Sequence, residues 1–318
     1  MVEFARLAPV VALKVDDVTY QKPAAVPKLP ALKRLSVSAI AADNLNNILS
    51  AAENLESFDV TRIVDPRPAA VRLPAGLREL SIPVGLLGTL NLQACRHVDS
   101  VKLWCSVTPE GISRLAPTPL ESLPAIRELV VIDGTDQDLR LTARLSSLRA
   151  LTLQGGLPTM PLSDDGMSAI ADLKDLEALS IDGGWDVTDS GMEMLAKLRN
   201  LRRLSLTDFP RVTPKAIESI TKMRGLRALE LRLDQVSSTH THAVLEQLQS
   251  LDQISDLCVH GLIVDSDLNQ LAGFKNLQVL DLEQASGYTT AMLSSVIDRL
   301  PKLTEVRIVS RYLVPERQ

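Results

Sequence analysis

A nine-residue pattern of leucines recurs along the chain. It reads L-x-x-L-x-x-L-x-L in residues 173–181 and 198–206, and close copies occupy 145–153, 223–231 and 274–282. In the last positions of the pattern apolar and polar residues alternate, which is the period of a β-strand with one buried and one exposed face. Each copy therefore predicts a short strand that turns its leucines towards a core.

Weaker copies fill the rest of the chain, so one equivalent strand position can be assigned to each repeat. These positions are Leu13, Leu35, Phe58, Leu80, Val101, Leu129, Leu151, Leu179, Leu204, Leu229, Leu257, Leu280 and Val306. They lie 21 to 28 residues apart, and a unit of this size buries its apolar face only by stacking on its neighbours. The sequence predicts one domain over 1–318 with about 13 repeats, in which 1–28 form a degenerate first repeat or cap and 309–318 a polar tail.

The segment between one predicted strand and the next, here called the return segment, shows apolar residues at the spacing of an α-helix. Several return segments begin with a hydroxyl residue. A side-chain oxygen there can accept a hydrogen bond from a free amide of the first helical turn. The N-caps predicted in this way are Thr108, Ser163, Thr188 and Thr213. Asp164 and Asp189 follow two of them, where a carboxylate complements the helix dipole. We therefore expect parallel strands on one face of a solenoid and helices on the other.

The clearest return segment is VTDSGMEMLAKL, residues 187–198. Together with the strand motif L-x-x-L-x-L, it resembles leucine-rich repeats of the ribonuclease-inhibitor-like superfamily, and within them the cysteine-containing and bacterial GALA types. The resemblance covers nearly the whole chain and is strongest over 145–282. It implies an α/β leucine-rich-repeat solenoid, a right-handed horseshoe with parallel strands on the concave face and helices on the convex face. It also implies protein binding without catalysis.

The repeats depart from the family pattern two residues beyond the strand. Family members usually carry Cys or Asn there, whereas this chain has Gly134, Gly156, Gly184, Phe209 or Leu262. The usual ladder of asparagine or cysteine side chains between successive turns is therefore missing. Glycine at this position suggests that the chain turns by backbone freedom instead.

Composition narrows the class of function. Aromatic residues make up 3% of the chain against 45% hydrophobic residues, which suits narrow, regular core layers of Leu, Ile, Val and Ala. The net charge is −5 and the charges are interspersed, so no basic stripe favours nucleic acid or a membrane surface. The N-terminus does not resemble a signal peptide, and no stretch is apolar enough to span a bilayer. We therefore expect a cytoplasmic monomer.

Motifs that would carry chemistry are absent. The sequence contains no G-x-x-x-x-G-K-[ST], H-E-x-x-H, G-x-S-x-G or C-x-x-C, so we expect no enzyme activity, no cofactor and no metal. His240 and His242 provide too few ligands for a zinc site and are interpreted as surface residues. His97 and His260 stand alone in the sequence and are interpreted as structural or exposed.

Two further groups of residues receive a structural interpretation. An odd, sparse cysteine count makes no disulfide framework, so the cysteines are interpreted as small buried side chains. They are Cys95, Cys105 and Cys258. A group of acidic residues around Gly134 lacks the spacing of a calcium loop and is interpreted as a solvated loop. Its members are Asp133, Asp136 and Asp138.

Outward strand positions predict the surface that a partner would contact. The residues expected to bind a protein partner are Lys102, Trp104, Val130, Ile132, Gln154, Asp182 and Arg232. Trp104 with Val130 and Ile132 forms an apolar cluster of the kind found at interface centres. A competing hypothesis is that the proline-rich segment 109–124 folds over Trp104. The polar stretch with Asp182 and Arg232 is interpreted as a solvated face or a rim that steers charged partners.

The expected function is a protein-interaction module that binds a protein partner on its concave face. Two other roles stay open. A bacterial effector or adaptor acting inside a host cell would be one setting for the same binding. A regulator that resembles leucine-rich-repeat GTPase activators would need a loop arginine and usually an acidic tail, and this sequence has no acidic tail and no arginine that can be singled out.

Overall fold

The structure is a computed structural model that describes residues 10–18, 26–64, 71–105, 107–108, 111–112, 120–155, 162–184, 186–232, 238–282 and 285–308. The chain divides into two compact units. The N-terminal unit consists of Met1–Gly134 with Arg144–Arg149, and the C-terminal unit consists of Thr135–Ala143 with Ala150–Gln318. Both are built from the same strand-and-return repeat. A single domain over 1–318 stays a prediction.

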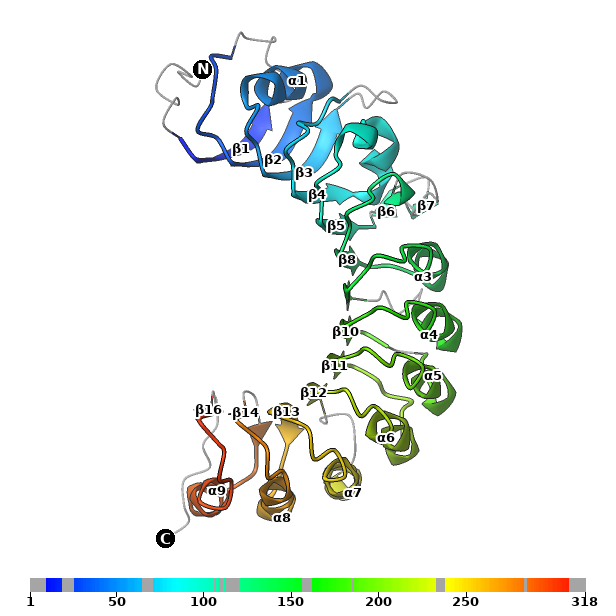
Figure 1. Cartoon of the computed structure of the whole chain (residues 1–318), viewed down its shortest axis with the longest axis vertical. Coiled ribbons are helices and arrows are strands. Elements are labelled where there is room, and N and C mark those ends of the chain that lie inside the picture. Colours follow the sequence, from blue (N-terminus) through cyan, green and yellow to red (C-terminus); the bar gives the residue numbers. More distant parts are fainter. Residues whose placement is uncertain are drawn as a thin grey trace. The chain divides into compact units, whose positions relative to one another are not determined.

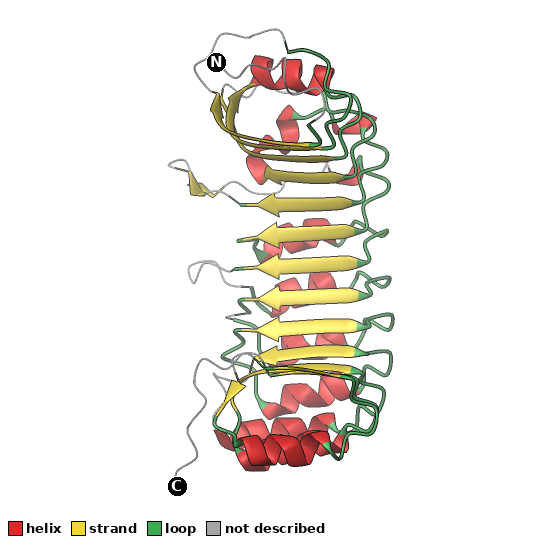
Figure 2. Cartoon of the chain, turned by 90° about the vertical axis from the view of Figure 1, so that its left-hand side faces the viewer, coloured by secondary structure: helices red, strands yellow, loops and turns green. Residues whose placement is uncertain are grey.

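Parallel strands stack side by side in the N-terminal unit (Figure 2). They are β1 (Ala12–Val18), β2 (Arg34–Ala41), β3 (Ser57–Val64), β4 (Glu79–Pro83), β5 (Ser100–Trp104) and β8 (Glu128–Ile132). Their register places the predicted strand positions beside one another, from Leu13 against Leu35 to Val101 against Leu129. The repeat assignment is therefore confirmed in this unit.

The return segments of the N-terminal unit are irregular. An α-helix, α1 (Ala42–Ala51), follows β2, but β4 is followed by short 3₁₀ helices, η2 (Val84–Thr89) and η3 (Leu92–Ala94). Two glycines within η2 lower its α-helix propensity. After β5, the short strands β6 (Val107–Thr108) and β7 (Gly111–Ile112) pair antiparallel. The prediction of a helix N-cap at Thr108 is therefore wrong, because its backbone pairs with Gly111 across this hairpin.

The C-terminal unit is more regular. Its main sheet consists of β9 (Ala150–Gln154), β10 (Ala178–Asp182), β11 (Arg203–Thr207), β12 (Ala228–Arg232), β13 (Asp256–Leu262), β14 (Val279–Asp281) and β16 (Glu305–Arg307). A short strand, β15 (Ala285–Ser286), pairs in parallel with the last residues of β13. The helices are α3 (Asp136–Thr142), α4 (Asp164–Ile170), α5 (Asp189–Leu195), α6 (Pro214–Thr221), α7 (Ser238–Leu248), α8 (Asp265–Gln270) with the 3₁₀ turn η4 (Leu271–Gly273), and α9 (Thr290–Ile297). They cover one face of the sheet and leave the other face uncovered (Figure 1).

The core lies between this sheet and its helices. On β10, Leu179 and Ile181 are buried while Ser180 between them faces outward, as the alternation predicts. Met192 and Leu195 of α5 are equally buried from the helix side. Full burial of one such side chain contributes roughly 1.5–3 kcal/mol. Regular layers of aliphatic side chains thus hold successive repeats together.

In several repeats a residue with a left-handed backbone lies at or near the end of the strand. The residues at this equivalent position have φ between 55° and 112° and are Asp133, Gly155, Gly183, Asp208 and Gly261. Glycine and aspartate tolerate this conformation better than most residues. The turn therefore falls one residue earlier than predicted. Gly184 serves packing instead, since a Cβ there would lie 2.2 Å from the Phe209 ring.

Successive helices of the C-terminal unit are joined at their N-termini by carboxylates. The first residue of one helix accepts two hydrogen bonds from the N-cap residue of the next, one from the backbone N–H and one from the hydroxyl. The pairs of this aspartate ladder are Asp136–Ser163, Asp164–Thr188, Asp189–Thr213 and Asp265–Thr289, at 2.5–3.0 Å. Hydrogen bonds therefore link successive repeats on the helix side, although the position that usually carries asparagine or cysteine holds other residues in this chain.

Each ladder hydroxyl also caps its own helix. Thr188 donates to Asp164 and accepts from the backbone N–H of Ser190, so the predicted N-cap is confirmed. Ser163 and Thr213 are confirmed in the same way. The glycine of the V-T-D-S-G segment makes room for this arrangement, since a Cβ on Gly191 would lie 2.3 Å from Asp164 Oδ1.

Helices α3 and α8 follow repeats that have no aspartate at this position. In each of them, an aspartate of the helix itself accepts the hydrogen bond from the N-cap residue. In α3, Asp138 accepts hydrogen bonds from the backbone N–H and the hydroxyl of Thr135, both at 2.8 Å. In α8, Asp267 accepts from the backbone N–H of Val264 at 3.2 Å. Asp136 and Asp138 thus belong to a helix terminus, and Asp138 is buried, so the interpretation of a solvated loop is wrong for both.

Candidate functional site

Outward side chains of the C-terminal unit line a hollow of about 480 Å³ on the face of the sheet that the helices leave uncovered. They form a column in which each residue pairs with its neighbour on the next strand. The column consists of Thr152, Ser180, Ser205, Glu230, Cys258, Asp281 and Arg307. The alternation in the sequence predicted these members as outward, and the strand register confirms their order.

The chemistry of the column changes along the unit. The column residues of β9, β10 and β11 carry hydroxyl groups, and Arg203 of β11 also lines the hollow. Strands β12 to β16 contribute a carboxylate, a thiol, a second carboxylate and a guanidinium, and His260 of β13 joins them in the lining. Within the column, groups able to bind ions, ligate metals or exchange protons therefore gather in the second half of the unit.

Three of these side chains converge. His260 Nε2 lies 3.1 Å from Cys258 Sγ and 3.0 Å from Glu230 Oε1. Glu230 stands beside Cys258 in the register of β12 and β13, and His260 is two residues further along β13 on the same face. His260 is 8% exposed, whereas Cys258 and Glu230 are half-buried. We call these residues the Glu-Cys-His cluster.

The surroundings of Glu230 favour the ionised form of its carboxyl group. The hydrogen bond with His260 lowers the pKa of Glu230 below its ordinary value, although partial burial opposes the shift. A hydrogen bond with Ser205 and the charge of Arg232 lower the pKa of Glu230 further. The cluster therefore holds an anionic oxygen at the floor of the hollow.

Charged groups flank the cluster on both sides. Arg232 stands beside His260 in the register and is half-buried, and its Nε has no hydrogen-bond partner within the described ranges. On the other side, Arg307 Nη1 lies 3.8 Å from Asp281 Oδ2. Arg232 was expected from the sequence to be a partner-binding residue, and the structure places it at the edge of the cluster.

The other candidates of the C-terminal unit are exposed. Gln154 lies at the end of β9 and Asp182 at the end of β10, both pointing away from the core. Asp182 Oδ1 accepts a hydrogen bond of 2.7 Å from the hydroxyl of Thr207 on the next strand. These residues lie on the same sheet face as the hollow.

Four candidates belong to the N-terminal unit. Lys102 pairs with Val130 and Trp104 pairs with Ile132 across β5 and β8. Lys102 is exposed, and the other three are half-buried. The position of Trp104 beside Ile132 on adjacent strands is therefore confirmed, and the binding of a partner by these residues stays a prediction. Most of the segment 109–124, which was considered as a cover for Trp104, lies outside the described residues.

The burial and contacts of His260 fit its interpretation as a structural residue, although it is isolated only in the sequence, because strand pairing brings Glu230 of the preceding repeat to its ring. The interpretation of Cys258 as a small buried side chain is wrong. Cys258 is half-exposed in the hollow, while Cys95 and Cys105 are buried as expected. The sequence pattern placed Glu230 next to Cys258 on the outer face and His260 at the next outward position of the same strand, but it did not predict that the three side chains meet.

No protein-family model matches the chain, and no curated protein sequence matches it. The crystal structure of an internalin from Listeria monocytogenes is similar, with a TM-score of 0.52 and 16% sequence identity. The match covers 97% of this chain and 89% of that chain. The fold is a leucine-rich-repeat solenoid. Its strand-and-helix repeats are of the α/β kind, and among the described residues no helix is long and apolar enough to cross a membrane.

Proposed function

We propose that this leucine-rich-repeat solenoid is a protein-interaction module that binds a protein partner through the outward face of its strands and has no catalytic activity of its own. One observation supports it most directly. In the C-terminal unit, strand pairing arranges outward side chains in a column along an open hollow of about 480 Å³. Side chains held on paired strands lose less conformational freedom on binding than side chains on loops.

The two units offer different contributions to such an interface. In the N-terminal unit, Trp104, Val130 and Ile132 provide an apolar patch next to the charge of Lys102. Large aromatic residues often dominate the binding energy of an interface, so Trp104 is the principal candidate. In the C-terminal unit, Gln154, Asp182 and Arg232 provide polar groups that would set orientation and specificity.

Affinity purification with mass spectrometry from the native cell tests this proposal. We expect the wild-type chain to capture a specific protein and Trp104→Ala to lose it, with a circular dichroism spectrum that matches the wild type. Capture of the same protein by every variant of the candidate residues would contradict binding through the strand face.

A matched pair of variants separates the two faces of one repeat. Gln154 is exposed on β9, and Ser168 is exposed on α4 on the opposite face. Gln154→Arg and Ser168→Arg add the same side chain to the same repeat. We expect Gln154→Arg to weaken capture and Ser168→Arg to leave it unchanged, and the reverse result would place the interface on the helices.

Finer assignments belong to the same proposal. The VTDSGMEMLAKL segment favours the ribonuclease-inhibitor-like superfamily and its cysteine-containing or GALA types. We propose a cytoplasmic monomer, and a secretion assay tests the alternative role of an effector delivered into a host cell. A GTP-hydrolysis assay with candidate GTPases tests the regulator role, for which we expect no stimulation.

A further inference from the structure

The Glu-Cys-His cluster brings three different metal-binding groups to one point. Its carboxylate oxygen, thiol sulfur and imidazole nitrogen all lie within 4.8 Å of one another. We propose that Glu230, Cys258 and His260 bind a divalent transition metal ion of the zinc class. This site is independent of the proposed protein binding, and it revises the expectation from the sequence that the chain binds no metal.

The distances suit a shared ion. Zinc takes sulfur, nitrogen and oxygen ligands at about 2.0–2.3 Å, which puts donor atoms of a tetrahedral site about 3.3–3.6 Å apart. His260 Nε2 lies 3.1 Å from the sulfur and 3.0 Å from the carboxylate oxygen. Small side-chain rotations that open the triangle by a few tenths of an ångström would therefore admit the ion.

The two close contacts of His260 Nε2 are explained better by a metal ion bound to all three side chains than by a hydrogen atom on this nitrogen. A ring nitrogen carries at most one hydrogen, so Nε2 cannot donate at full strength to both Cys258 Sγ and Glu230 Oε1. If Nε2 carries that hydrogen, it cannot accept one from the thiol. A metal ion satisfies all three atoms at once, with the thiol proton released to solvent.

A nucleophilic cysteine is the main alternative, and the geometry disfavours it. In a catalytic triad the orienting carboxylate binds Nδ1 of the histidine, while the nucleophile faces Nε2. Here Glu230 and Cys258 approach the same nitrogen, Nε2. Convergence on one nitrogen is expected of ligands around a common ion.

The scaffold and the charges fit the same conclusion. The ligands come from the paired strands β12 and β13, and ligands on strands are held more accurately than ligands on loops. A thiolate and a carboxylate balance the two positive charges of the ion. Mixed sulfur, nitrogen and oxygen donors suit zinc and cobalt better than magnesium or calcium. Three protein ligands leave a fourth position, which faces the hollow and is available to water or to a donor from a bound partner.

Cobalt provides the first test, because a cobalt–thiolate bond absorbs light where Co²⁺ in water does not. The full chain is stripped with a chelator and titrated with Co²⁺. We expect about one ion per chain and a sulfur-to-cobalt charge-transfer band that Zn²⁺ abolishes by displacement. Cys258→Ser should lose this band, and Glu230→Gln should weaken binding roughly tenfold or more. Asp182→Asn, an exposed carboxylate on the same face, is the matched control and should bind like the wild type.

Thiol labelling provides a second measurement that does not depend on a spectrum. Cys258 is half-exposed while Cys95 and Cys105 are buried, so an alkylating reagent should modify Cys258 first in the folded chain. We expect Zn²⁺ to protect Cys258 from alkylation in the wild type and not in Glu230→Gln. Absence of the cobalt band in the wild-type chain, its persistence in Cys258→Ser, or alkylation that Zn²⁺ does not slow would each overturn the proposal.

Discussion

The aspartate ladder should stabilise the helix layer measurably, and Asp164→Ala removes one of its steps. Asp164 accepts hydrogen bonds from the backbone N–H of Thr188 at 2.8 Å and from its hydroxyl at 2.7 Å. A hydrogen bond to a charged group contributes about 1.5–3 kcal/mol. Both residues are only half-buried, so we expect the free energy of unfolding to fall by about 2–4 kcal/mol rather than by the full sum. The loss includes the favourable position of the carboxylate in the first turn of α4.

The neighbouring residue is a matched control. Asp165 is exposed and pairs with Arg140 at 2.9 Å, with both side chains more than half exposed. Exposed ion pairs contribute at most about 1 kcal/mol, so Asp165→Ala should cost much less than Asp164→Ala. The two variants remove the same group from adjacent positions of one helix.

A second substitution should rescue the first. In α3, Asp138 caps its own helix from the third helical position, and Gly191 occupies that position in α5. Gly191→Asp alone should destabilise, because its Cβ would lie 2.3 Å from Asp164 Oδ1. In the Asp164→Ala background that oxygen is gone, and the new carboxylate can cap Thr188. We expect the double variant to be about 1–3 kcal/mol more stable than the sum of the single effects.

Urea unfolding followed by circular dichroism gives the stabilities of all these variants. Repeats of a solenoid can unfold separately, so amide hydrogen exchange in α5 should accompany it and locate the loss. Equal costs for Asp164→Ala and Asp165→Ala would refute the ladder as a stabilising device. If the change in the free energy of unfolding of the double variant equals the sum of the two single changes, an aspartate at position 191 does not replace the ladder aspartate at position 164.

Three further predictions follow from burial and protonation. Phe58 is fully buried, so Phe58→Ala should lower the free energy of unfolding by about 3–5 kcal/mol in urea titrations. The pKa of Glu230 is lowered on folding, so its contribution to stability is present above its unfolded pKa of about 4.3 and is lost as the pH falls through the folded pKa. Glu230→Gln should therefore flatten the acid limb of a stability–pH profile, and an unchanged limb would contradict this assignment. Burial raises the pKa of Cys95 to about 11, so mass spectrometry should find Cys95 unalkylated in the folded chain near pH 8.

The strand layer could be predicted from sequence because its signal is local. The L-x-L alternation fixes which side chains face the core, and a slip of one residue would expose every leucine of the strand. Leu179 and Leu204 therefore align as the pattern requires, and Ser180 and Ser205 align on the outer face. The outward column followed from this register without knowledge of any contact.

Contacts between side chains of different repeats could not be predicted in the same way. Glu230 and His260 are 30 residues apart, and their contact depends on the rotamers of both side chains. The partner of Asp164 was also missed, since a carboxylate in a first helical turn suits the dipole whether or not it reaches the next repeat. The prediction at Thr108 failed because a threonine followed by proline also suits a turn between two strands.

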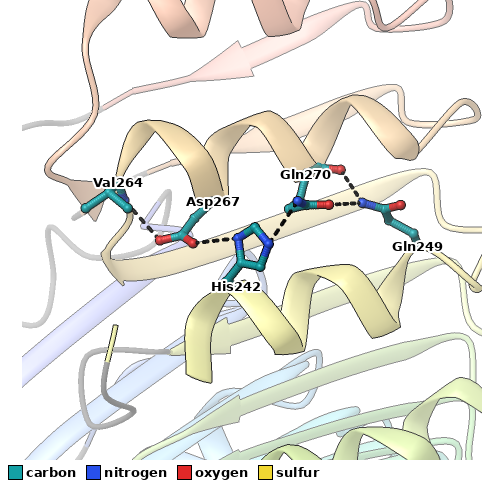
Figure 3. Close-up of polar contacts among 5 residues, drawn as sticks. All are labelled: His242, Gln249, Val264, Asp267 and Gln270. Atoms are coloured by element: carbon teal, nitrogen blue, oxygen red, sulfur yellow. Dashed lines mark hydrogen bonds and ion pairs between the residues drawn. The ribbon is translucent and has the colours of Figure 1, made fainter. Parts of the chain in front are cut away.

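The ladder aspartates and the self-capping Asp267 of α8 satisfy the same kind of backbone amide at a helix N-terminus. Proline begins α6 and serine begins α7, so neither offers a carboxylate to the helix after it. In α8 the free amide of Val264 is therefore satisfied by Asp267 of the same helix. Asp267 is buried, and its second oxygen lies 3.2 Å from His242 Nδ1 of α7, while Gln270 and Gln249 extend the contact between the two helices (Figure 3). The link between α7 and α8 thus passes through a histidine and amides where other repeats use a carboxylate and a hydroxyl. In α8, Asp267 thus provides the acceptor that an N-terminal amide of a helix needs where the preceding helix has no aspartate in its first position.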